Sequence, residues 1–156
     1  MMRRAKPENR EILPDVRYNS THLQTLVQHV LKMGKKSLAV SLVYGAMDLI
    51  NERTGKSAIE VFDSALKNVS PAMEVRPRRV GGATYQVPME VSSDRRLTLA
   101  IRWILSATRE RSGKSFSDKL ASELIDASNE TGAAIRKRDE THKMAEANRA
   151  FSHYRV

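Results

Sequence analysis

The chain has 156 residues, and its 27 Lys and Arg residues against 18 Asp and Glu residues give it a net charge of +9 at pH 7. This length favours a single domain with one hydrophobic core, and a 40% share of hydrophobic residues argues against wholesale disorder. The absence of cysteine excludes a disulfide framework, a thiolate zinc site and a cysteine nucleophile.

Residues 1–18 are predicted to be a basic arm. The segment contains Pro7, Pro14 and few apolar residues, so we expect it to bury too little surface to order itself. No apolar run follows that would make it a secretory signal, and no stretch of the chain approaches the roughly 18 apolar residues of a membrane span. We therefore expect a cytoplasmic protein with no membrane partner. The cations of the arm are Arg3, Arg4, Lys6, Arg10 and Arg17.

Residues 19–156 are predicted to form one mainly α domain of about six helices. Apolar residues recur at helical spacing from Ser20 to Gly34, in a second run before Gly55, and again between Ser57 and Val69. We expect Gly34 to be the residue that ends the first helix, and Ser57 with Glu60 to form a capping box. The core candidates are Leu23, Leu26, Val27, Val30, Leu31, Leu38, Ala39, Leu42, Val43, Ala46, Met47, Ile50, Ile59, Phe62, Leu66 and Val69.

Residues 73–91 follow a different period. Apolar and polar side chains alternate on both sides of Gly81-Gly82, which predicts a two-stranded hairpin. Pro77 and Pro88 cannot donate to a strand ladder, so each must face an open edge. The sequence therefore predicts a lone ribbon, which needs something to lie against to be stable.

The helical period returns in three further segments. One begins at Ser93, a second follows a box-like start at Ser115 and Asp118, and the last runs from Gly132 towards Phe151 with a thin apolar face. Their core candidates are Leu97, Ala100, Ile101, Ile104, Leu105, Phe116, Leu120, Ala121, Leu124 and Ile125.

Signals for an enzyme are weak. Gly55-Lys56-Ser57 and Gly113-Lys114-Ser115 look like the end of a phosphate-binding loop, but neither has the glycine that the loop requires five positions earlier. No two of the four histidines are spaced at i and i+4 as in a helical metal site, and no G-x-S-x-G motif marks a nucleophilic serine. We expect no catalytic residue, no metal and no cofactor.

The basic residues are better organised, and a pI near 10.1 is typical of a nucleic-acid binder. Arg95, Arg102 and Arg109 recur every seven residues, which places them on one stripe of a helix. Three more arginines, Arg76, Arg78 and Arg79, lie near the expected hairpin tip. Aromatic residues make up only 5% of the chain, too few for a base-stacking platform, so we expect recognition of folded RNA shape and phosphate position. A second expected stripe contains Arg138, His142, Arg149 and His153.

Several ordered blocks of sequence resemble the bacterial and organellar small-subunit ribosomal protein seven family over nearly the whole chain. The most specific blocks are the hairpin, from Glu74 to Pro88, and the tail, from His142 to Phe151 with His153-Tyr154-Arg155. Shorter blocks are Leu13-Pro14-Asp15 with Tyr18-Asn19-Ser20, Gly34-Lys35-Lys36-Ser37 with Ala39, and Tyr44-Gly45-Ala46. The chain departs from many members at Val16, where they have proline, and at its end, Val156, where they have tryptophan.

The resemblance implies a six-helix domain with a protruding hairpin and a non-catalytic role. Family members bind the 3′ major domain of small-subunit ribosomal RNA early and nucleate assembly of the subunit head. They lie near the exit-site tRNA and the messenger, contact neighbouring small-subunit proteins, and in some cases repress their own operon mRNA. Bacterial and plastid origins are both compatible with the resemblance.

Two groups of residues are predicted from the basic pattern and the resemblance together. The rRNA-binding candidates are Arg3, Arg4, Lys6, Arg10, Lys35, Lys36, Arg76, Arg78, Arg79, Arg95, Arg102, Arg109, Lys114, Arg138 and His142. The candidates near tRNA and messenger are Arg78, Arg79, Gly81, Gly82, Tyr85, Arg149, Tyr154 and Arg155.

Two alternatives from other classes remain open at this point. A DNA-binding architectural protein would bind duplex DNA as tightly as ribosomal RNA. A phosphate-transfer enzyme built on Gly55-Lys56-Ser57 would bind nucleotide.

Overall fold

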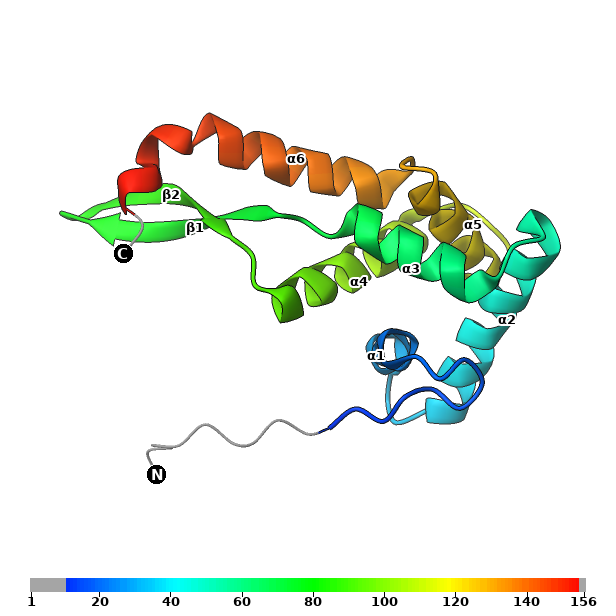
Figure 1. The fold of residues 1–156 in the computed structure, drawn as a ribbon. Coiled ribbons are helices and arrows are strands. Elements are labelled where there is room, and N and C mark those ends of the chain that lie inside the picture. Colours follow the sequence, from blue (N-terminus) through cyan, green and yellow to red (C-terminus); the bar gives the residue numbers. More distant parts are fainter. Residues whose placement is uncertain (1–10, 155–156) are drawn as a thin grey trace, which may run out of the picture.

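Six α-helices and one hairpin make up most of the chain in the computed structural model, which describes residues 11–154 (Figure 1). A short 3-10 helix, η1, follows the last α-helix. The predicted mainly α class with a two-stranded hairpin is confirmed. In chain order the elements are α1 (Thr21–Val30), α2 (Lys36–Thr54), α3 (Ala58–Val69), β1 (Met73–Val80), β2 (Ala83–Glu90), α4 (Ser93–Glu110), α5 (Phe116–Ser128), α6 (Ala133–Ala147) and η1 (Arg149–Tyr154).

The hydrophobic core lies where α5 packs against α2, α3 and α4 (Figure 1). Large side chains from five helices meet there fully buried, and full burial of one such side chain stabilises the fold by roughly 1.5–3 kcal/mol. The helical spacing of apolar residues in the sequence predicted most of these residues. The largest are Leu26 of α1, Met47 of α2, Phe62 of α3, Ile101 of α4 and Leu124 of α5.

Gly45 permits the close approach of α2 and α5. A Cβ at this position would lie 3.2 Å from the Oγ of Ser117, and that hydroxyl donates a hydrogen bond to the carbonyl of Leu42 at 2.8 Å. A larger residue at Gly45 would have to displace this hydroxyl. The small residue therefore sets the distance between the two helices.

Three local predictions are wrong. The first helix ends at Val30, four residues before Gly34, which instead has a φ of 73° in the following turn. Ser57 makes no side-chain cap; the Oδ1 of Asn51 accepts the Ala58 N–H at 2.8 Å in its place. Leu38 is 53% exposed rather than part of the core.

The hairpin has the turn and register that its glycines and prolines predict. Gly81 and Gly82 have φ values of 58° and 87°, as a tight turn with two left-handed residues requires. Pro77 opposes Gln86 and Pro88 opposes Val75. Counting from the turn, both are non-hydrogen-bonded pairs, so neither proline interrupts the ladder. Within residues 11–154, β1 and β2 form the only sheet, and no third strand pairs with either of them.

The C-terminal part of the chain supplies the support that the ribbon needs. Helix α6 runs beside the hairpin and η1 packs on β2 (Figure 1). The ring of Tyr85 in β2 lies 5.3 Å from that of Phe151 and 5.0 Å from that of Tyr154, measured between centroids. Aromatic pairs at this separation add to the stability gained from buried area.

Residues 15–18 are ordered by a buried carboxylate, so the expectation that the segment to Tyr18 has no order is wrong for these residues. Asp15 is 4% exposed. It accepts hydrogen bonds from the Tyr44 hydroxyl at 2.7 Å and from the N–H groups of Arg17 and Tyr18, each at 3.0 Å. Arg17 also pairs with Asp48 of α2 at 2.6 Å. Polar contacts to α2 thus replace the apolar burial that the segment lacks.

Replacing Tyr44 with phenylalanine is expected to lower the free energy of unfolding by about 1–2 kcal/mol, because Asp15 loses a hydrogen bond in a buried position. Burial, and then the hydrogen bond to Asp15, raise the pKa of the Tyr44 hydroxyl above its usual value. The folded state therefore holds this proton more tightly than the unfolded chain. Its stabilising contribution is present below about pH 10 and is lost as pH rises through the raised pKa.

Urea unfolding of Tyr44→Phe and wild type at pH 7 and above pH 10 measures both effects. The difference in the free energy of unfolding between wild type and Tyr44→Phe should be smaller at the higher pH. An equal gap at both values would contradict the assignment.

Candidate nucleic-acid interface

Cations that make no contact with an acid are the ones best placed to bind phosphate, because a paired guanidinium is already partly neutralised. Six of the predicted rRNA-binding residues are exposed and have no ion pair or side-chain hydrogen bond within residues 11–154. They come from the start of α2, the hairpin tip, α4 and the α4–α5 turn. These residues are Lys35, Lys36, Arg79, Arg102, Arg109 and Lys114.

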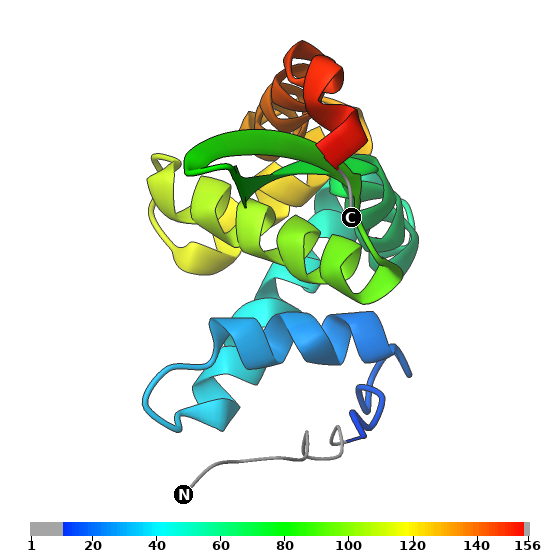
Figure 2. The ribbon, with the colours of Figure 1, turned by 90° about the vertical axis from the view of Figure 1, so that its left-hand side faces the viewer.

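Helix α4 carries the predicted arginine stripe. Arg95, Arg102 and Arg109 are exposed, whereas Ile101 and Ile104 on the opposite side are fully buried. Figure 2 shows α4 lying between α1 and the hairpin, so its stripe is held on a rigid part of the molecule. The prediction that these three arginines are turned away from the core is confirmed.

The hairpin arginines differ in their surroundings. Arg76 pairs with Glu74, and so does Arg95 of α4, whereas Arg79 has no such partner among residues 11–154. Arg78 lies exposed between them. At the tip, a Cβ added to Gly81 or Gly82 would meet no atom within 4 Å, so the tip is open to a large partner.

The expected exposed stripe on the last helix is wrong for its first two members. Arg138 is half-buried and donates to the carbonyl of Asn68 at 2.6 Å, while it also pairs with Asp139 at 2.7 Å. The Nε2 of His142 accepts the N–H of Ala72 at 3.1 Å. Arg138 thus fastens α6 to the end of α3, and His142 fastens it to the segment that leads into β1.

The candidates near tRNA and messenger are partly brought together. Tyr85 and Tyr154 stack in the aromatic cluster described above, and Phe151 joins them, although sequence reasoning gave it no role. Arg149 begins η1 beside this cluster and pairs with Glu146 on the surface at 3.2 Å. Arg155, like Arg3, Arg4, Lys6 and Arg10, lies outside the described residues.

The root of the arm adjoins the basic turn between α1 and α2. Arg17, Lys36, Tyr44 and Asp48 line one shallow hollow on α2. Arg17 thus lies beside Lys36 in this hollow, while Asp15 holds the backbone of Arg17 in place.

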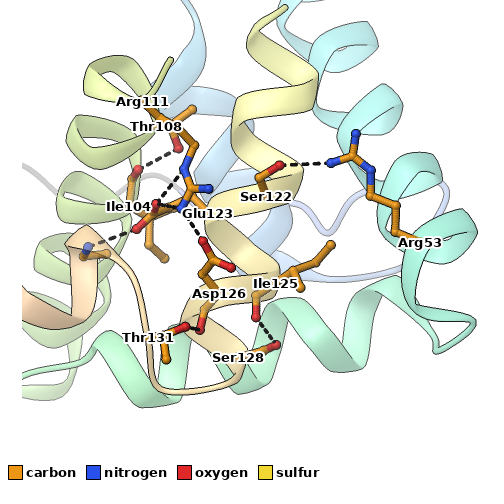
Figure 3. A network of polar contacts seen from close by, with 11 residues as sticks. Arg53, Ile104, Thr108, Arg111, Ser122, Glu123, Ile125, Asp126, Ser128 and Thr131 are labelled. Atoms are coloured by element: carbon orange, nitrogen blue, oxygen red, sulfur yellow. Dashed lines mark hydrogen bonds and ion pairs between the residues drawn. The ribbon is translucent and has the colours of Figure 1, made fainter. Parts of the chain in front are cut away.

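Two carboxylates that order the site escaped sequence reasoning: Glu74 and Glu123. Glu123 of α5 is fully buried, accepts two hydrogen bonds from Arg111 at 3.1 and 2.7 Å, and accepts the Ala134 N–H at 3.0 Å. Arg111 also contacts Asp126 (Figure 3). The only local signal is that Glu123 stands among the apolar positions of its helix.

The network keeps Arg111 charged. Burial lowers the pKa of the Arg111 guanidinium, but its hydrogen bonds to Asp126 and Glu123 and their charges outweigh that effect, so the pKa lies above its usual value. Arg111 is therefore a structural cation that joins the end of α4 to α5.

The motifs weighed for enzyme chemistry are turns. Gly55 has a φ of 64° and caps the C-terminus of α2, and Ser115 accepts the Asp118 N–H at 3.2 Å at the start of α5. Neither follows a strand, so both lack the backbone cradle of a phosphate loop. Within residues 11–154 there is no group of three metal-ligating side chains, and no helix is long and apolar enough to cross a membrane.

Comparison with known proteins points in one direction. A family described as "Ribosomal protein S7p/S5e" matches residues 2–149. The chain is 58% identical over 155 residues to the small ribosomal subunit protein uS7 of Thermoanaerobacter sp., 59% identical to that of Pelotomaculum thermopropionicum and 56% identical to that of Thermosynechococcus vestitus. In each case the match covers 99% of both chains.

Proposed function

The chain belongs to the S7p/S5e family of ribosomal proteins, and on that premise we propose that it binds the 3′ major domain of small-subunit ribosomal RNA directly and nucleates assembly of the subunit head. As a member of this family it is a structural, non-enzymatic constituent of the small ribosomal subunit that binds RNA in translation. Its location is therefore the ribosome. The relative from the cyanobacterium Thermosynechococcus vestitus keeps a plastid origin open beside a bacterial one.

The observation that carries the proposal is the separation of cations into two kinds. Acidic side chains pair with Arg53, Arg111 and Arg138, which lie at contacts between elements or beside the core. Arg79, Arg102, Arg109 and the two lysines at the start of α2, Lys35 and Lys36, have no such partner within residues 11–154. Each can replace counterions on a phosphate, and together they stand on three elements, the hairpin, α4 and the start of α2. One body can thus hold several RNA segments at fixed separations.

The hairpin and the C-terminal turn form the part of the proposal that concerns tRNA and messenger. The hairpin projects beyond the helical core, with Arg79 near its tip and Tyr85 fixed by η1 (Figure 1). On the same grounds we propose that Arg78, Gly81, Gly82, Arg149 and Tyr154 lie near exit-site tRNA, and we add Arg155, outside the described residues, from the resemblance alone. Neighbouring small-subunit proteins are further proposed partners, and the protein's own operon mRNA is another.

Footprinting of the purified protein on intact small-subunit ribosomal RNA tests the proposal. Hydroxyl-radical protection is expected at low ionic strength, confined to the 3′ major domain. Affinity should fall with salt by about 0.9 in log–log slope for each phosphate neutralised.

Duplex DNA of equal length serves as the competitor in the same assay. Equal displacement by DNA would favour the architectural DNA-binding alternative. Absence of any protection from chemical cleavage would contradict RNA binding.

A further inference from the structure

A single carboxylate joins the hairpin to α4. Glu74 of β1 is buried, with its side chain only 8% exposed. Its Oε1 accepts the Nε–H of Arg76 at 2.6 Å and the Nε–H of Arg95 at 2.8 Å, and its Oε2 lies 2.9 Å from the same Arg95 nitrogen. Two guanidinium groups from different elements therefore meet at one acid.

This contact joins β1 directly to α4. Arg96 also bonds from α4, but to the carbonyl of Val91, which lies after β2. Glu74 thus ties the base of the hairpin to the arginine stripe of α4.

Both arginines keep donors free for a ligand. Their side chains are 47% and 45% exposed, and within residues 11–154 only their Nε atoms are bonded. The terminal nitrogens of a guanidinium are the ones that bind phosphate bidentately. Without the acid between them, two like charges this close would repel each other.

We propose that Glu74 is a positioning residue for RNA binding, which holds Arg76 and Arg95 side by side so that both contact one stretch of RNA backbone between the hairpin and α4. This inference rests on the proposed function. It makes a prediction opposite to that of simple charge: removal of this acid should weaken the binding of a polyanion.

The test compares Glu74→Gln with Glu90→Gln in binding to small-subunit ribosomal RNA. Each substitution raises the net charge from +9 to +10. Glu90 is exposed on β2, opposes Met73 and has no ion pair within residues 11–154. We expect Glu74→Gln to bind about tenfold more weakly than wild type, the loss of one charge-assisted contact, and Glu90→Gln to bind as tightly as wild type or more tightly.

The salt dependence separates positioning from general stability. If Arg76 and Arg95 lose their phosphate contacts, the log–log slope of Glu74→Gln should become shallower by about one to two units. In a background in which both arginines are glutamine, Glu74→Gln should cause no further loss, because no guanidinium remains to be positioned. A further loss there would assign Glu74 to folding alone and overturn the inference.

The outcomes distinguish the two proposals. If wild type does not bind ribosomal RNA, the proposed function fails. If wild type binds and Glu74→Gln binds as well as Glu90→Gln, the function stands and the role of Glu74 is wrong.

Discussion

Replacing Glu123 with alanine is expected to lower the free energy of unfolding by about 3–4 kcal/mol, the cost of removing one partner from a buried ion pair. Glu123 lies on α5, and its carboxylate is fully buried against the start of α6. Its loss leaves Arg111 with Asp126 alone and leaves the Ala134 N–H without an acceptor (Figure 3). The loop at Gly132 would also lose its contact with the Glu123 side chain. A Cβ added at Gly132 would lie only 3.0 Å from Glu123 Oε1, so the two are closely packed.

Urea unfolding followed by circular dichroism measures this change. The matched control is Asp118→Ala, which removes the acid that contacts Arg53. The side chains of this pair are 40% and 35% exposed. An exposed pair contributes at most about 1 kcal/mol, so this control should change stability little. Similar losses in both variants would show that burial of Glu123 does not matter.

The double variant Arg102→Ala/Arg109→Ala is expected to bind small-subunit ribosomal RNA about 100-fold more weakly than wild type, since each arginine would lose a contact worth about 1.4 kcal/mol or more. Both side chains are exposed on α4 and have no acidic partner among residues 11–154. The log–log salt slope should fall by about 1.8, for two phosphates. Filter binding at several salt concentrations measures both quantities.

Arg53→Ala/Lys137→Ala is the control, because it removes the same amount of charge from cations that already have acidic partners, Asp118 and Glu140. Its affinity should fall much less. If both double variants bind equally weakly, net charge rather than the α4 stripe determines affinity. Circular dichroism confirms that each variant is folded before binding is compared.

Local signals predicted the hairpin well. Alternation on both sides of Gly81-Gly82 determined the turn, and two prolines that cannot donate restricted the register to pairings in which neither interrupts the ladder. Each of these signals lies within a few residues of the structure that it specifies. The same holds for the Ser115 cap and for the apolar faces of α4 and α5.

Polar contacts between distant segments could not be predicted. His142 bonds to Ala72, and Arg138 to Asn68, across about 70 residues of sequence, so helical spacing alone placed them on an exposed stripe. Asp15 is buried because Tyr44 of α2 reaches it, which composition does not reveal. Glu123 stands among apolar positions of its helix, and its role as the partner of Arg111 is seen only in the folded structure.

The two prolines have a consequence before the protein meets RNA. A ribbon of two strands has two margins, and an unguarded margin invites another chain to add a strand. Pro77 is exposed on β1 and offers no N–H at a position that faces away from β2, whereas Pro88 on the other margin is buried beside α6. Freshly synthesised copies should therefore stay apart rather than polymerise through their ribbons.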